Sequence, residues 1–421
     1  MTRRERADTR DGLRNPLTRD AFAGLAFVLL ATSTTFAQVA DGGPDPAKVR
    51  VRIGPLWMNP SISLPNIGID TNVFNDSLDA TPKRDFTVTA SPRTDLWLRL
   101  GRTWFSGAIS EDIVWYQTYA SERSANSSYA LAWKAPLNRV VLSTGATWVK
   151  TRARPGFEID ARVQRNEPAY TAAVEVRGFA KTFIGVRGRW TRVSFDDSAI
   201  FQGRSLSAEL DRKGTSAAVT IRHDLTPLTS VTFGVGRAEE RFDFSTARDS
   251  TTDDYSVLLS FDPAALLKGS ATFGYMNFKP QSTDLPGYQG LTFEVALAYT
   301  VLGSTQFTGT LRRDVEFSYD PNQPYYLVTG GGASIAQQIF GPVDVVARAG
   351  VQRLAYRTRV GTAIVAPDRT DRLRTYGGGV GFRMGTDLRL GFNIDKERRT
   401  SVLTAREYRG LKYGTSITYG Q

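Results

Sequence analysis

The chain has 421 residues, with 53 Lys or Arg against 42 Asp or Glu, so its formal net charge is +11. It holds no cysteine and one histidine, His223. This excludes a disulfide framework, a thiolate nucleophile and a metal site built from several His or Cys ligands. We expect no metal and no cofactor.

The first 37 residues are predicted to be a cleaved signal peptide. Several arginines, including Arg3, Arg4 and Arg6, come before an apolar run over 21–30. Thr35 and Ala37 then place small residues at the two critical cleavage positions. Cleavage near Ala37 leaves a mature chain that starts at Gln38. A short anchor helix is the alternative, but the apolar run is short for a membrane span.

The next segment, 38–57, is basic and rich in proline. We expect a periplasmic N-terminal segment here. Simple disorder is the plainest interpretation, and contact with a partner protein is the alternative.

Residues 58–421 divide into about eighteen short segments in which apolar and polar residues alternate. The clearest example carries its apolar residues at every second position: Leu291, Phe293, Val295, Leu297, Tyr299 and Val301. Such a period turns one set of side chains toward lipid and the other toward a lumen. We therefore predict an all-β fold, a transmembrane antiparallel up-and-down β-barrel of about 18 strands. A soluble β-sandwich also alternates and is the competing fold.

The connections between these segments alternate between short and long. Tight turns fall at 101–102, 136–139, 180–181, 226–229, 263–267, 302–304, 340–342 and 384–386. Long polar connections lie between them, among them 152–167, 196–212 and 357–372. Short turns of outer-membrane barrels face the periplasm and long loops face outward. Both termini are therefore expected in the periplasm.

Aromatic residues gather near the strand ends, which favours two girdles at headgroup depth. The set toward the long loops is Trp115, Tyr116, Tyr119, Phe195, Phe242, Phe244, Phe317, Tyr319, Tyr325, Tyr326, Tyr356 and Tyr376. The set toward the tight turns is Trp133, Phe179, Phe183, Phe261, Phe340, Phe382 and Tyr419. The ordinary preference of aromatic residues for strands explains part of this pattern.

Several blocks of the chain resemble the putative β-barrel porin 2 family. They are 66–74 (NIGIDTNVF), 225–229 (LTPLT), 241–243 (RFD), 263–275 (PAALLKGSATFGY), 288–291 (YQGL) and 302–326 (LGSTQFTGTLRRDVEFSYDPNQPYY). The resemblance spans most of 58–356. It implies an outer-membrane barrel of a Gram-negative (diderm) bacterium, in a family that includes proteins linked to exopolysaccharide biosynthesis and export, and it supplies no catalytic residues.

The polar face of the predicted strands is rich in charge. The candidate selectivity residues of the lumen are Arg177, Arg187, Arg189, Arg222, Arg312, Asp314, Glu316, Arg348 and Arg389. Hydrated charges inside a wide barrel select solutes, so Arg187, Arg189 and Arg312 suggest an arginine ladder for an anionic solute. Because carboxylates are interspersed, a self-neutralising ion-pair network that fills the lumen is the alternative.

These features lead to two hypotheses on function. The first is a porin-like channel for solutes or for exopolysaccharide export. The second is a closed structural or interaction barrel whose outer loops bind polysaccharide or a partner. An enzyme is not expected, since His223 stands beside Asp224 with no nucleophile motif. Expected partners are outer-membrane lipid, lipopolysaccharide and, during biogenesis, the outer-membrane assembly machinery. Nucleic acid is not expected, because the basic residues are scattered.

Overall fold

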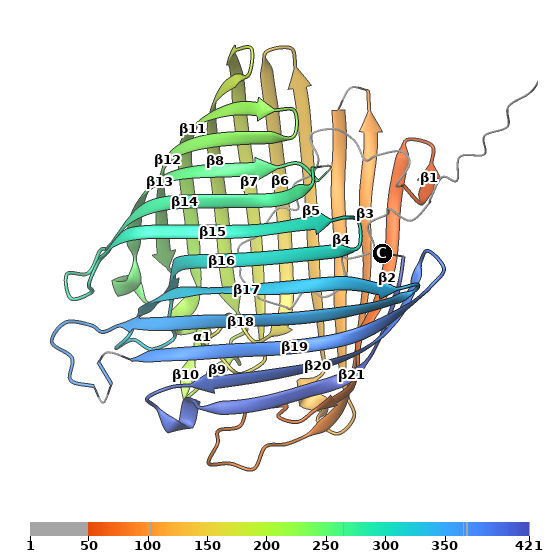
Figure 1. Ribbon diagram of the computed structural model, residues 1–421. Helices are drawn as coiled ribbons and strands as arrows, with labels where there is room; N and C mark the ends of the chain where they lie inside the picture. The colour runs from red at the N-terminus through yellow and green to blue at the C-terminus, as the bar shows by residue number, and fades with distance from the viewer. Residues whose placement is uncertain (1–48, 102, 264, 365, 368, 421) are drawn as a thin grey trace, which may run out of the picture.

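The computed structural model describes residues 49–101, 103–263, 265–364, 366–367 and 369–420 (Figure 1). The predicted signal peptide lies outside these residues. Nineteen strands hydrogen-bond in one sheet, and β1 (Val51–Ile53) pairs only with β2 (Leu56–Asp70). The other eighteen close on themselves because β21 pairs with β2, with all neighbours antiparallel. The closed, all-β antiparallel barrel expected from the alternation is thus confirmed.

The first half of the wall consists of β2 (Leu56–Asp70), β3 (Asp85–Leu100), β4 (Thr103–Tyr116), β5 (Ser124–Leu137), β6 (Val140–Ala153), β7 (Val163–Phe179), β8 (Thr182–Phe195), β11 (Arg212–Thr226) and β12 (Thr229–Phe242). The second half consists of β13 (Ser250–Phe261), β14 (Leu267–Pro280), β15 (Tyr288–Val301), β16 (Thr305–Phe317), β17 (Tyr325–Phe340), β18 (Val343–Arg357), β19 (Thr370–Met384), β20 (Leu388–Thr400) and β21 (Tyr408–Tyr419). Within the described residues no helix is long and apolar enough to cross a membrane.

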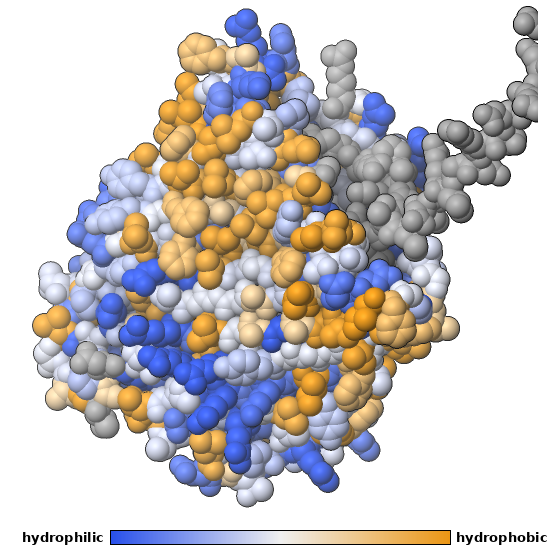
Figure 2. Space-filling view, in the orientation of Figure 1, coloured by the Kyte–Doolittle hydropathy of each residue, from blue (hydrophilic) through white to orange (hydrophobic). Residues whose placement is uncertain are grey.

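Side-chain exposure follows the predicted two-residue period. On β12, Phe233 and Val235 point outward and are each more than half exposed. Thr232 precedes them on the inner face and is buried. The same holds on β15, where Leu291 is 68% exposed. Figure 2 shows hydrophobic side chains gathered over β11–β14. An apolar outer surface of this extent is unfavourable in water and suits a lipid surround.

Short turns join the strands at one end and long loops join them at the other, which we call the outer end. The β15–β16 turn illustrates the local chemistry. Leu302 and Gly303 both have positive φ angles, 49° and 69°, a backbone conformation that fits the twist of a tight hairpin. Leu302 is 94% exposed, so its side chain forfeits no packing inside the wall.

The N-terminal segment differs from expectation. Val51–Ile53 form β1, which pairs with the first residues of β2. The end of the 38–57 segment is therefore a hairpin, and the interpretation as simple disorder is wrong for these residues. Hydrogen bonding to the start of β2 supplies the order that the polar, proline-rich composition did not suggest.

The long connection 196–212 also holds unexpected structure. It forms a small hairpin of β9 (Ile200–Phe201) and β10 (Arg204–Ser205), followed by α1 (Leu206–Leu210). Ser205 caps α1, accepting a hydrogen bond from the Ala208 backbone N–H. The remaining short elements are single 3₁₀ turns, η1 (Ala120–Glu122), η2 (Thr246–Arg248) and η3 (Thr404–Arg406).

The wall opens locally at the outer end between β15 and β16. These strands pair only as far as Phe293 and Arg313. Beyond that point β16 pairs with β17 alone, while β17 continues to pair with β18. Both faces of β17 become buried there. Four successive residues are no more than 5% exposed: Tyr325, Tyr326, Leu327 and Val328. The outer tip of the β16–β17 hairpin is therefore packed on both sides instead of facing lipid.

Candidate functional site

The predicted selectivity residues all lie on the inner face of the wall. Their strand positions alternate with outward apolar residues such as Ile184 and Val186, which flank the inward Gly185. They come from six strands: Arg177 on β7, Arg187 and Arg189 on β8, Arg222 on β11, Arg312, Asp314 and Glu316 on β16, Arg348 on β18 and Arg389 on β20. The alternation alone was enough to predict their inward position.

Two arginines of β7 and β11 hold an inward aromatic ring. The Arg222 guanidinium lies 4.0 Å from the centroid of Phe183, and that of Arg177 lies 5.1 Å from it. Arg222 also pairs with Asp224 and, at 3.1 Å, with Glu175. Phe183 is only 5% exposed, so this ring packs against the inner face of the wall. It is not part of an aromatic girdle.

Arg187 and Arg189 stand next to this group on β8. Arg187 is exposed, and within the described residues no ion pair is found for it. The carboxylates of Glu240, Glu167 and Glu294 interact electrostatically with Arg189. The β8 wall therefore presents one solvent-facing positive charge beside one that is partly balanced.

The remaining candidates are ion-paired. Arg312 contacts Glu316 at 2.7 Å and Asp314 at 3.6 Å. Arg348 and Asp395 form a two-pronged pair at 2.6 and 2.7 Å. The first set lies within β16, and the second connects β18 to β20 across Gly377 of β19. Both leave little free charge for a solute.

Asp344 pairs with two further arginines near the short-turn end of the barrel. This carboxylate is fully buried and contacts Arg389 at 2.5 Å and Arg383 at 3.4 Å. The self-neutralising network considered as an alternative thus describes Arg312, Arg348 and Arg389. The ladder interpretation fits Arg187 best.

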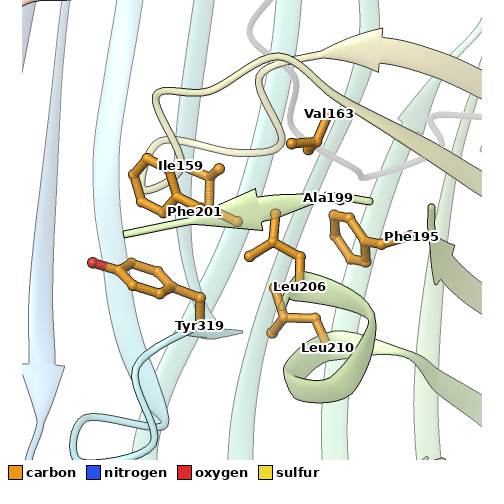
Figure 3. Close-up of a cluster of buried hydrophobic side chains, with 8 residues drawn as sticks. All are labelled: Ile159, Val163, Phe195, Ala199, Phe201, Leu206, Leu210 and Tyr319. Carbon is orange, nitrogen blue, oxygen red and sulfur yellow. The ribbon is translucent and has the colours of Figure 1, made fainter. Parts of the chain in front are cut away.

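An apolar cluster crosses the outer mouth, and we call it the outer plug (Figure 3). It joins the β6–β7 loop, the β8–β11 connection and the β16–β17 loop. Its members are Ile159, Val163, Phe195, Ala199, Phe201, Leu206, Leu210 and Tyr319, each no more than 8% exposed. Phe201 and Tyr319 meet edge to face, with their centroids 4.8 Å apart. Segments from distant strands are thus held together over the lumen.

Buried charges hold the plug against the wall. Asp160 pairs with Arg399 at 3.1 Å and with Arg406 at 3.0 Å. Arg399 continues to Asp371 at 2.6 Å, and Arg369 pairs with the same carboxylate at 2.7 Å. The loop that contains Asp160 is therefore tied to β20 and to the β20–β21 loop.

Glu158 lies beside Ile159 of the plug and is buried, with 2% exposure. It accepts hydrogen bonds from the Ser318 hydroxyl at 2.7 Å and from the Tyr319 backbone N–H at 3.2 Å. Burial raises the pKa of this carboxyl, and the hydrogen bonds and nearby arginines only partly oppose that rise. Arg248 donates to the Ser318 carbonyl and pairs with Glu209 at 2.9 Å.

The outer plug was not expected from the sequence. Seven of the aromatic residues assigned to the outer girdle are in fact buried at the outer end: Tyr116, Phe195, Phe242, Tyr319, Tyr325, Tyr326 and Tyr356. Trp115 and Tyr376 are exposed, as a girdle requires. A signal for the plug was present, since Phe201, Leu206 and Leu210 form an apolar set inside a connection otherwise interpreted as polar.

A closed, lipid-facing barrel with a charged interior defines a porin-like outer-membrane β-barrel protein. Residues 45–419 match the family described as putative β-barrel porin 2, and the chain belongs to that family. This confirms the resemblance found in the sequence. No curated protein matches the chain.

Solved structures show distant similarity. The outer membrane protein OpdK of Pseudomonas aeruginosa has a TM-score of 0.45 and 9% identity, covering 87% of this chain and 99% of that one. A BenF-like porin of Pseudomonas fluorescens Pf-5 has a TM-score of 0.45 and 11% identity, covering 86% and 98%. OccK2 (OpdF) of Pseudomonas aeruginosa, solved with glucuronate, has a TM-score of 0.45 and 12% identity, covering 86% and 97%.

Proposed function

We propose that this barrel is a channel for anionic, hydrophilic solutes, with acidic sugars or exopolysaccharide as the substrate class, and that the outer plug is its gate. The observation that carries the proposal is the inward, exposed and unpaired Arg187 among the described residues, beside Arg189. A fixed positive charge in a hydrated lumen raises the local anion concentration.

The expected size of the effect follows from Coulomb's law. An anion that passes about 7 Å from one such charge in water gains about 0.6 kcal/mol, roughly a threefold enrichment before salt screening. Arg187 is thus sufficient to bias selectivity, and the ion-paired arginines contribute less.

A second candidate function is a closed structural or interaction barrel. It is supported by the outer plug, whose apolar cluster and buried ion pairs give the mouth a packed interior. In that case the outer loops would carry the function by binding polysaccharide or a partner.

Ion selectivity in a planar bilayer tests the channel proposal. The refolded mature chain is measured under a KCl gradient, and the reversal potential is compared with that of Arg187→Gln. We expect anion preference in the parent and a clear loss of it in the variant. The matched control is Arg192→Gln. Arg192 lies on the same strand but faces outward and pairs with Asp243 at 3.0 Å. This variant should leave the reversal potential unchanged. Equal reversal potentials for parent and Arg187→Gln would contradict the role of Arg187.

A further inference from the structure

Six basic side chains form a patch on the outward face at the outer ends of β18–β21. This outer basic patch consists of Arg353, Arg372, Arg374, Lys396, Arg398 and Arg409, and all six are exposed. Their positions continue the outward-facing positions of the strands, because each lies an even number of residues from an exposed apolar one such as Tyr376 or Ile394. Figure 2 shows the hydrophilic area over the loop-side ends of β18–β20.

The strand register places like charges side by side. Arg374 lies directly opposite Arg398, and Arg398 lies directly opposite Arg409. Arg353 likewise lies opposite Arg372. Like charges in directly opposed positions destabilise a sheet. No carboxylate is paired with any of these six side chains within the part of the chain that the structure describes.

A second outward cluster shows the contrasting arrangement. On β8, β11 and β12, Arg192, Lys213 and Arg241 also lie opposite one another. There, Asp243 lies 3.0 Å from Arg192 and 3.6 Å from Lys213, and Glu239 lies 3.2 Å from Arg241. The protein supplies its own anions to that cluster but none to the outer basic patch, so an external anion would relieve the repulsion there.

The surroundings of the patch indicate what that anion belongs to. Toward the middle of the same strands lie exposed apolar side chains, including Val380, Phe392 and Tyr413. A ligand that covers both surfaces needs a negative headgroup above hydrocarbon chains. Five of the six basic residues are arginines, whose planar fork matches phosphate oxygens in two-pronged geometry.

We propose that the outer basic patch binds the phosphate groups of a phosphorylated glycolipid in the outer leaflet, the lipid A part of lipopolysaccharide. Its position at the long-loop end fits the outer headgroup layer, and anionic headgroups are attracted to clusters of this kind. The site requires an outer-membrane barrel but does not rest on transport, so it stands whether or not the barrel conducts.

Direct binding tests the proposal with the refolded mature chain in neutral detergent. Bis-phosphorylated lipid A is titrated and followed by native mass spectrometry, with dephosphorylated lipid A as the probe without charge. The test variant carries Arg374→Gln, Arg398→Gln and Arg409→Gln. The matched control carries Arg192→Gln, Lys213→Gln and Arg241→Gln. Heat-modifiable migration on gels first establishes that each variant is folded.

We expect the test variant to bind bis-phosphorylated lipid A at least about 10-fold more weakly than the parent, and the control to stay within about 3-fold. Dephosphorylated lipid A should bind the parent and the test variant equally weakly. Equal binding by the parent and the test variant, equal losses in both triple variants, or tight binding of the dephosphorylated probe to the parent would each overturn the proposal. If the triple variant does not refold, Arg398→Gln at the centre of the row gives the same test with a smaller expected change.

Discussion

Releasing the outer plug should open the barrel. Asp160→Asn is a minimal substitution that should release the plug, because Asp160 ties it to Arg399 and Arg406. The Asp160 side chain is 15% exposed and receives two guanidinium groups, those of Arg399 and Arg406, which are 1% and 5% exposed. The substitution keeps the shape of the side chain and removes its charge. It leaves Arg406 without its carboxylate partner in a buried position.

The magnitude follows from the burial of these groups. Breaking a buried ion pair by removing one partner costs about 3–5 kcal/mol. Because Arg399 keeps Asp371 as an ion-pair partner at 2.6 Å, we take the lower end of this range. A loss of about 3 kcal/mol shifts the equilibrium between the plugged and released states by roughly 150-fold, at 1.36 kcal/mol per factor of ten.

Open probability in single-channel records is the primary assay, and trypsin cleavage after Arg162 of the same loop is the second. Both should rise strongly in Asp160→Asn. The matched control is Asp284→Asn, since Asp284 pairs with Arg359 at 3.1 Å in a loop outside the plug and is 37% exposed. An exposed ion pair stabilises a fold far less than a buried one does, because water screens it. The same open probability and cleavage rate in both variants would refute the reasoning.

Two further predictions concern pH and barrel closure. Because burial raises the pKa of Glu158 above its ordinary value of 4.5, the plugged state binds this proton more tightly than the released state does. That stabilisation is complete below the ordinary value and is lost as pH rises through the raised one. Open probability should therefore fall as the outer solution is acidified from neutral pH, and Glu158→Gln should abolish this dependence; an unchanged pH profile in Glu158→Gln would exclude Glu158 as its source. At the closing seam, a Cβ on Gly68 would lie 2.0 Å from the Tyr413 carbonyl oxygen, whereas one on Gly309 would meet nothing within 4 Å. Gly68→Ala should thus reduce the yield of heat-modifiable protein while Gly309→Ala leaves it unchanged, and equal yields would show that the seam tolerates the side chain.

The wall of the barrel was predictable because its signal is local. The two-residue period at 291–301 and the alternation of turn lengths follow directly from the need to pair every backbone group inside a membrane. The inward position of Arg187 or Arg348 follows from the same period. Whether each charge is paired depends on the register of neighbouring strands, as for Arg348 and Asp395, and one sequence does not give that register directly.

The outer plug was not predictable in the same way. Ile159, Phe201 and Tyr319 come from three separate connections, and no short-range pattern links them. Tyr325 and Tyr326 looked like girdle residues because aromatic residues near strand ends usually are. Their burial follows from the early end of β15–β16 pairing at Phe293 and Arg313, which is a long-range property of the fold.

The most direct test of a plugged, anion-selective channel compares the mature chain with a variant in which residues 197–210 are replaced by a flexible Gly-Ser linker. This removes β9, β10, α1 and four of the eight residues of the apolar cluster while β8 and β11 stay connected. We expect rare openings for the parent chain and stable, anion-selective conductance steps for the variant in a planar bilayer. A folded, heat-modifiable variant that stays electrically silent would contradict the channel and favour a closed structural barrel.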